Sequence, residues 1–131
     1  MPLFALLSLQ VVLAEPRNIT LVIQNNASVD VQSARFGASP PRDYGPVRAG
    51  GTITTTFEAN PGSECAASVE ATATYANAAD VNTVSGSGTV DLCNATRVTV
   101  SIDGAAPEPP GTGPDGIVTL PTVSSVTVSS D

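Results

Sequence analysis

Few side chains in this sequence could carry catalytic chemistry. Its 131 residues include two cysteines and no histidine or tryptophan. Because a Ser-His-Asp or Cys-His site requires an imidazole, the sequence excludes both, together with any histidine-containing metal site. No Asp-rich loop has the spacing typical of a calcium site, so we expect no metal and no cofactor.

Paired carboxylates are the remaining acid–base option. The candidates by residue type are Glu58, Glu64, Glu70, Asp80 and Asp91. Glu58 and Glu70 fall on the polar faces of predicted strands, where a solvated side chain is the usual outcome. We therefore predict that the protein is not an enzyme.

Residues 1–14, MPLFALLSLQVVLA, are typical of a secretory signal peptide. The apolar run Leu3–Leu13 has the length of a signal-peptide core and is shorter than the roughly 20 residues of a membrane span. Val12 and Ala14 favour cleavage before Glu15. The segment before the apolar run has no Lys or Arg, so an interfacial anchor or a misassigned start is the alternative. We expect a secreted, extracellular chain with no transmembrane segment after cleavage.

Cys65 and Cys93 form an even pair in a chain predicted to be exported, which favours one disulfide. A redox or metal role would require a CxxC spacing or further ligands. Closing a ring of this size is expected to stabilise the fold by about 3–4 kcal/mol.

Three Asn-x-Ser/Thr patterns predict N-glycosylation, at Asn18, Asn26 and Asn94. Asn18 lies a few residues after the predicted cleavage point and is the least expected to be modified. The alternative is that the patterns arise by chance in a chain rich in Ser and Thr.

The segment PPRDYGPVR, residues 40–48, is the best candidate for a binding loop. Long loops in compact domains often carry function, and Tyr and Arg are common interface anchors. The candidate residues are Arg42, Asp43, Tyr44 and Arg48. The alternative is a surface connection in which Arg42 pairs with Asp43 or another acid and Tyr44 covers the core.

The charge distribution limits the partners. Twelve acidic and five basic residues give a net charge of -7, and all five basic residues are arginines. Nucleic-acid binding and adsorption to an anionic membrane are therefore not expected. An extracellular protein or glycan of unknown identity is the expected partner.

Period-two alternation of apolar and polar residues predicts strands along most of the chain. Residues 29–36 change phase, which predicts a bulge near Gln32–Ser33. In residues 65–75 the alternation places Cys65 on the buried side, and residues 76–82 are expected to form a loop. The other predicted strands are residues 19–23, 52–57, 84–92 and 98–102.

The register around two glycines is ambiguous. Pairing Cys65 directly with Cys93 would place Ser85, Ser87, Thr89 and Asp91 on the core face. Either a bulge at Gly86–Gly88 corrects the register, or the two strands lie in different sheets. The bulge is the favoured alternative, because glycine in a strand often marks one.

These elements predict an all-β fold, a small antiparallel β-sandwich or Greek-key of immunoglobulin-like architecture with six to seven strands and one disulfide. After the signal peptide we expect the sandwich at residues 15–104 and a Pro/Gly-rich linker at 105–116. Residues 117–131 are interpreted as a final strand, part of an O-glycosylated stalk or a disordered tail.

Residues 19–62, with ITLVIQNNASVDV followed by AGGTITTTFEANPG, are loosely similar to the opening of aegerolysin-type and thaumatin-like β-sandwich proteins. The chain lacks the tryptophans of the first family and the many cysteines of the second. Our leading hypothesis is a secreted, non-catalytic extracellular binding, structural or effector module. The alternatives are a membrane-active protein resembling aegerolysins and a carboxylate-dependent glycan-active enzyme.

Overall fold

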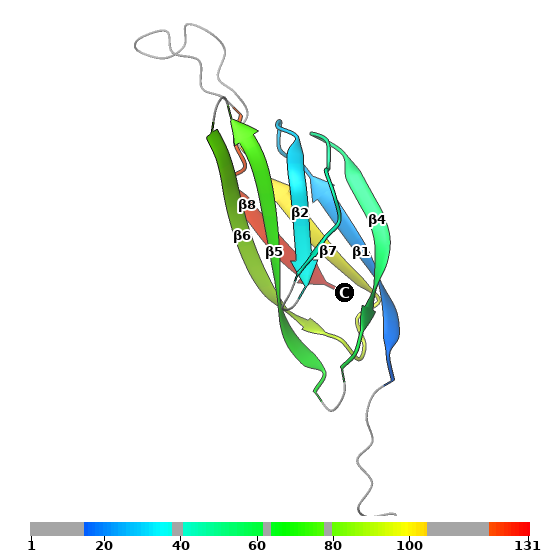
Figure 1. Cartoon of the computed structure of the whole chain (residues 1–131). Helices are drawn as coiled ribbons and strands as arrows, with labels where there is room; N and C mark the ends of the chain where they lie inside the picture. Colours follow the sequence, from blue (N-terminus) through cyan, green and yellow to red (C-terminus); the bar gives the residue numbers. More distant parts are fainter. Residues whose placement is uncertain (1–14, 38–40, 62–63, 78–79, 105–120) are drawn as a thin grey trace, which may run out of the picture.

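The computed structural model describes residues 15–37, 41–61, 64–77, 80–104 and 121–131, which form eight strands and no helix (Figure 1). The all-β class is therefore confirmed. One strand more than predicted is present, because two residues of the expected loop pair with a neighbour. The strands are β1 (Arg17–Asn25), β2 (Val31–Gly37), β3 (Arg42–Asp43), β4 (Thr52–Ala59), β5 (Ala66–Asn77), β6 (Asp80–Asp91), β7 (Arg97–Asp103) and β8 (Ser125–Ser130).

The strands form two four-stranded sheets, in the orders β4-β1-β7-β8 and β3-β2-β5-β6. In Figure 1 the two sheets lie one behind the other, with their inner faces toward a shared core. Every adjacent pair is antiparallel except β1 and β7, which run parallel. The fully antiparallel prediction is wrong at this pair, because the chain passes through the second sheet before β7 returns beside β1.

The central strands of the first sheet follow the predicted alternation. Ile19, Leu21 and Ile23 of β1 are fully buried, and β7 buries Val98, Val100 and Ile102 in the same way. Between them, on the outer face, lie half-buried residues that are polar except for Val22. Burying one face of each strand removes apolar area from water at roughly 25 cal/mol per Å², so these two strands form the centre of the core.

The predicted phase change in β2 is confirmed. The register of β2 on β5 shifts between Val31 and Ser33. This irregularity allows Val31 on one side of it and Ala34 and Phe36 on the other to be buried together. A regular strand would alternate without interruption and expose one of the two groups.

The register of β5 on β6 contradicts both sequence alternatives. The two strands lie in one sheet, and their pairing runs without a shift from Ala66↔Asp91 to Asn77↔Asp80. The strands continue into residues 76–82, which were expected to be a loop. The two cysteines lie beyond the paired residues and are not directly opposite each other, because Cys93 is one residue further along than the register would place the partner of Cys65. With this register, Val90 and Gly88 face the core and no bulge is needed.

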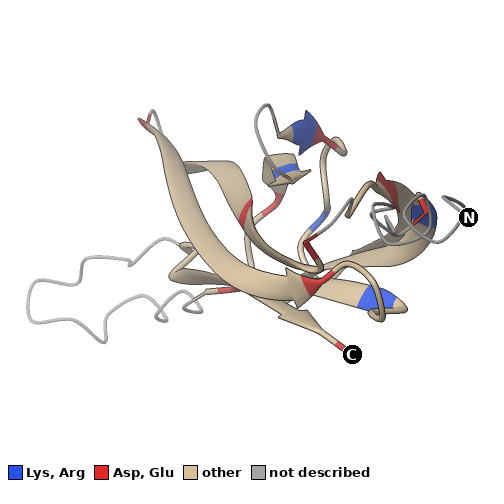
Figure 2. Ribbon diagram, turned by 90° about the horizontal axis from the view of Figure 1, so that it is seen from below, with Lys and Arg blue, Asp and Glu red and all other residues tan. Residues whose placement is uncertain are grey.

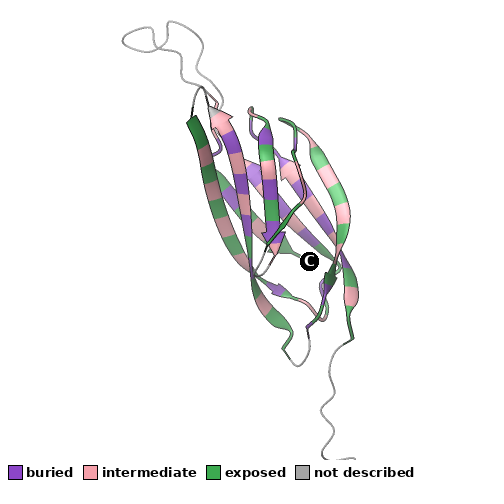
Figure 3. Cartoon of the chain, viewed as in Figure 1, coloured by how far each residue is buried: buried purple, intermediate pink, exposed green. Residues whose placement is uncertain are grey.

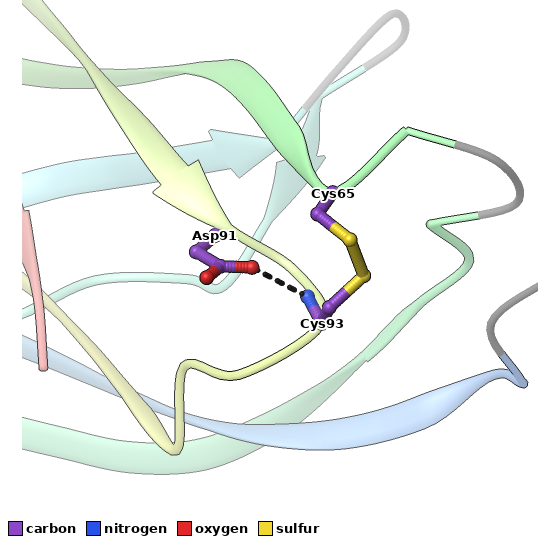
Figure 4. A group of neighbouring side chains, drawn as sticks. All are labelled: Cys65, Asp91 and Cys93. Carbon is purple, nitrogen blue, oxygen red and sulfur yellow. Dashed lines mark hydrogen bonds between the residues drawn. A yellow bond between two sulfur atoms is a disulfide. The ribbon is translucent and has the colours of Figure 1, made fainter.

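The disulfide between Cys65 and Cys93 is present, with a Cα–Cα distance of 5.1 Å (Figure 4). Cys65 is exposed, so its predicted place on the buried side is wrong. The residue precedes β5, where the alternation no longer applies. The Asp91 carboxylate accepts a hydrogen bond of 3.0 Å from the Cys93 N–H. Both sulfurs lie near this carboxylate, but they are bonded to each other and offer no thiolate to a metal.

Residues Ser125–Ser130 form a strand, one of the three interpretations of the C-terminal segment. β8 pairs with β7 from Val98↔Ser130 to Asp103↔Ser125, and Val123 and Val126 are buried. The predicted signal peptide at residues 1–14, the predicted linker at 105–116 and residues 117–120 lie outside the described residues. Nothing in the described part of the chain is a helix able to cross a membrane.

Two glycines of β6 let the two sheets approach each other closely at one side. A Cβ atom added to Gly86 would lie 1.7 Å from the Val126 carbonyl oxygen, and one added to Gly88 would lie 2.7 Å from the Val128 carbonyl oxygen. Any side chain would therefore collide with the backbone of β8. We call the side formed by β6 and β8 the closed side. The requirement for glycine comes from the other sheet and not from a bulge.

Candidate functional site

The opposite side of the sandwich, formed by β3 and β4, is not sealed in this way. The inward residues of β4 are Ile53, Thr55 and Phe57, and all three are half-buried. In Figure 3 the body of β4 alternates between intermediate and exposed residues, whereas β5 shows buried ones. We call this side the open side.

A cleft of about 480 Å³ lies at the open side, between the two sheets. It is lined by residues that are far apart in the sequence and that come from β1, β2, β3, β4, β5 and the segment after β6. Those that matter for its chemistry are Phe36, Arg42, Tyr44, Phe57, Glu58 and Leu92. We call it the β3–β4 cleft. Its volume falls in the range typical of small-molecule sites.

Aromatic rings provide much of the apolar lining. The rings of Phe36 and Phe57 meet edge to face, with centroids 5.1 Å apart and an interplanar angle of 64°. Phe36 is buried, whereas Phe57 and Tyr44 are half-buried. These three are in the cleft, and Tyr75 is the other aromatic residue of the described chain. An otherwise aromatic-poor protein thus concentrates its rings at one place.

The cleft contains one cation, Arg42. Its guanidinium carbon lies 5.4 Å from the centre of the Tyr44 ring, a cation–π arrangement. Within the described part of the chain, no carboxylate or other acceptor pairs with this guanidinium. Stacking therefore positions the charged group while its N–H donors stay available.

The structure places two of the four residues of the predicted binding loop at the cleft. Arg42 and Tyr44 line the cleft, whereas Asp43 and Arg48 do not. The segment is also not a free loop, because β3 pairs with β2 through Arg35↔Asp43 and Phe36↔Arg42. Pro residues at 41 and 46 limit this pairing, since proline has no N–H to donate.

Asp43 has a structural role beside the cleft. Its carboxylate accepts hydrogen bonds from the Gly45 N–H, at 2.8 Å, and from the Ser33 hydroxyl, at 3.0 Å. Gly45 has a φ of 90°, which glycine adopts without strain. The Gly45 hydrogen bond, aided by Ser33 and the charge of Arg35, holds the pKa of Asp43 below its ordinary value. The Arg42–Asp43 ion pair of the alternative interpretation is not present, since the partners of this carboxylate are Gly45 and Ser33.

A buried amide that the sequence analysis missed anchors the connection between β1 and β2, at the end of β1 away from the cleft residue Asn18. Asn25 is completely buried, and its Nδ2 donates to the carbonyl oxygens of Val29 (2.9 Å) and Val47 (3.1 Å). Its Oδ1 accepts from the Ala27 N–H at 3.0 Å. Asn25 is in phase with the buried Ile23 and Leu21 of β1, so the alternation distinguishes it from Asn26, but the polar composition of the segment was interpreted as a turn. These hydrogen bonds hold the connection from β1 to β2 against the segment that leads to β4.

The carboxylate candidates and the glycosylation candidates are dispersed. Glu58 lines the cleft, and the other four acidic candidates do not. The three asparagines are all exposed, and Asn18 lies at the cleft. The Asn26 and Asn94 side chains donate to Asp103 and Asp91, at 3.3 and 2.9 Å. Glycosylation stays a prediction.

Charged residues lie mainly near strand ends and in connections along the ribbon (Figure 2). Asp91 illustrates this arrangement at the end of β6. The Asn94 side-chain amide, together with the backbone N–H groups of Cys93 and Asn94 and the charge of Arg17, holds the pKa of Asp91 below its ordinary value. These contacts cap the turn after β6, so they account for Asp91 without a catalytic role.

No family model matches this chain, and neither a curated protein nor a solved structure is significantly similar to it. The loose similarity to aegerolysin-type and thaumatin-like proteins therefore gains no support from these comparisons. The geometry of the cleft is the remaining basis for a functional argument.

Proposed function

We propose that this protein is a secreted, non-catalytic binding protein that takes a small ligand into the β3–β4 cleft. The observation that carries the proposal is the concentration of Phe36, Tyr44 and Phe57 around a cleft of about 480 Å³. Concave, mainly apolar clefts with a few polar groups are the usual form of small-ligand sites. This narrows the expected partner from a protein or glycan surface to a molecule that fits between two sheets.

The proposal includes the extracellular location. The apolar segment before Ala14, the disulfide and the three exposed asparagines of the glycosylation patterns are consistent with export. A disulfide at an exposed position persists in an oxidising compartment and would be reduced in the cytosol.

The proposal also includes an immunoglobulin-like Greek-key arrangement of the two sheets. The support is the connection order, in which the chain crosses between sheets after β1, β3, β4 and β6 and the sheets have the orders β4-β1-β7-β8 and β3-β2-β5-β6. Such sandwiches leave edges where ligands can enter between the sheets, and the open side is one of them.

Cleft binding is tested with the neutral dye Nile red, which fluoresces strongly in apolar sites. We expect the secreted, deglycosylated protein to bind the dye with saturable fluorescence. Phe57→Ser should abolish this signal by removing an apolar wall, and Ala67→Phe should abolish it by filling the cleft, since Ala67 also lines it. Ser87→Ala, on the exposed outer face of β6, is the matched control.

Phe57→Ser enlarges the cleft, whereas Ala67→Phe fills it. If both variants lose dye binding, one common packing defect cannot be the cause. Far-ultraviolet circular dichroism and thermal melting check that each variant is folded. Unchanged dye binding in both folded cleft variants, or no binding by the wild-type protein, would contradict the proposal.

Export is tested by the intact mass of the protein secreted from a eukaryotic host carrying the full chain. We expect a chain beginning at Glu15, a mass decrease on deglycosylation, and alkylation of two thiols only after reduction. A full-length, unmodified mass with two free thiols would contradict this part of the proposal.

A further inference from the structure

We infer that the ligand of the β3–β4 cleft is an amphipathic anion, an apolar chain or ring that ends in a carboxylate or a similar acidic group. This inference rests on the proposed function, because it assumes that the cleft binds a small molecule. Two features carry it: the apolar interior, and an arginine at its edge that stacks on Tyr44 and has no acidic partner among the described residues.

The interior favours an apolar body. Phe36 and Val69 are buried, and Phe57, Ala67 and Leu92 are half-buried around the same space. Covering the remaining exposed parts of these side chains would remove apolar area from water, which is the main source of affinity for such ligands. A fully polar ligand would gain no affinity from covering these apolar side chains.

The edge favours an anionic head group. The Arg42 guanidinium is held over the Tyr44 ring, and no acceptor pairs with it in the described part of the chain. Guanidinium groups present parallel N–H donors that match a carboxylate, and they are weakly hydrated compared with ammonium groups. A cation placed beside apolar rings without an acid is therefore suited to an acid supplied by the ligand.

The nearby acids do not neutralise Arg42. The Asp43 carboxylate is engaged by the Gly45 N–H and the Ser33 hydroxyl. Glu58 lines the cleft but forms no ion pair with Arg42. The net charge of -7 opposes anions at long range, but physiological salt screens charges beyond about 8 Å. The local cation therefore determines the preference.

The test is a charge series on one apolar body: decanoate, decanol and decylammonium, each kept below its micelle concentration and measured by displacement of Nile red. We expect decanoate to bind most tightly, decanol less tightly and decylammonium least tightly. Arg42→Gln should weaken decanoate binding about fivefold, the upper range for an exposed ion pair, and leave decanol binding unchanged. Arg48→Gln is the matched control, an exposed arginine six residues along the chain and outside the cleft.

Charge reversal sharpens the test. Arg42→Glu should bind decylammonium more tightly than decanoate, which a merely structural role for Arg42 would not produce. Equal affinities of the wild-type protein for decanoate and decanol, or the same decanoate affinity in Arg42→Gln and Arg48→Gln, would overturn the inference while leaving the proposed function intact. Failure of both Nile red and decanol to bind would overturn both.

Discussion

The two sheets pack against each other differently at the two sides of the sandwich. At the closed side, Gly86 and Gly88 of β6 remove side chains so that the backbone of β8 can lie directly against the strand. At the open side, β4 faces the two-residue strand β3, and the space between the sheets is lined by aromatic rings.

From this difference we infer that the closed side contributes to stability and that the open side has surface available for a ligand. Close packing with small residues leaves no room for a ligand, because the interior is filled by backbone. Half-buried rings beside a short edge strand leave apolar surface that a ligand can still cover. We therefore propose that the same sandwich has a structural side and a binding side.

The disulfide is expected to make the largest single contribution to stability, and it lies at the end of the β5–β6 pair, beside Leu92 of the cleft. Cys65 and Cys93 are 28 residues apart and enclose the β5–β6 pair. Replacing both by alanine should lower the free energy of unfolding by about 3–4 kcal/mol, because the unfolded chain without the cross-link has a higher conformational entropy. Urea denaturation measures this loss. A loss of less than about 1 kcal/mol would mean that the ring is already constrained in the unfolded state.

Gly86→Val tests the closed side directly. The new Cβ would coincide with the space of the Val126 carbonyl oxygen, so β8 or β6 must move. We expect a loss of about 3 kcal/mol, the upper range for overpacking, measured by the same denaturation. Ser87→Val in the same strand points to the outer face and is exposed. It should change stability by less than about 0.5 kcal/mol; equal losses in the two variants would refute the close approach of the sheets.

Phe57→Ala tests the open side. Its ring is half-buried and contacts Phe36, so we expect a loss of about 1–2 kcal/mol, less than the 3–5 kcal/mol of a fully buried phenylalanine. Thermal and urea unfolding provide the measurement. A loss as large as that of the disulfide variant would place Phe57 in the packed core and weaken the distinction between the sides.

The smallest expected effect is a pH dependence at Asp91. Its pKa is below the ordinary value of 3.8 in the folded protein, chiefly because of the Asn94 amide. Ionised Asp91 therefore stabilises the fold above about pH 4, and this contribution disappears as the pH falls through the lower, folded-state pKa. Stability curves measured between neutral and acidic pH should be flatter in Asp91→Asn in that window. An identical acid dependence in both proteins would contradict the capping role.

Local patterns predicted the elements in which each strand follows its own alternation. The alternations of β1 and β7 and the phase change of β2 are visible in the sequence because burial imposes a period of two. The disulfide followed from the number and context of the cysteines. The register of β6 was missed, because the cysteines lie outside the ladder and are offset by one residue.

The cleft was only partly predictable. Arg42 and Tyr44 stood out as an unusual loop composition, but Phe36, Phe57 and Leu92 lie in predicted strands and their residue types do not mark them as site residues. Their meeting depends on the pairing of β4 with β1 and on the crossing of the two sheets, which no local pattern encodes. Gly86 and Gly88 were misinterpreted for the same reason, since the backbone that requires them belongs to a strand some 40 residues later.

The central claim is that small ligands bind at the open side and not at the closed side. The most direct measurement is a titration of isotope-labelled protein with decanol, followed by the chemical shifts of the backbone amides. The account predicts shifts concentrated at Phe36, Tyr44 and Phe57, with Gly86 and Gly88 unchanged. Shifts centred on the two glycines, or no saturable shifts at all, would contradict it.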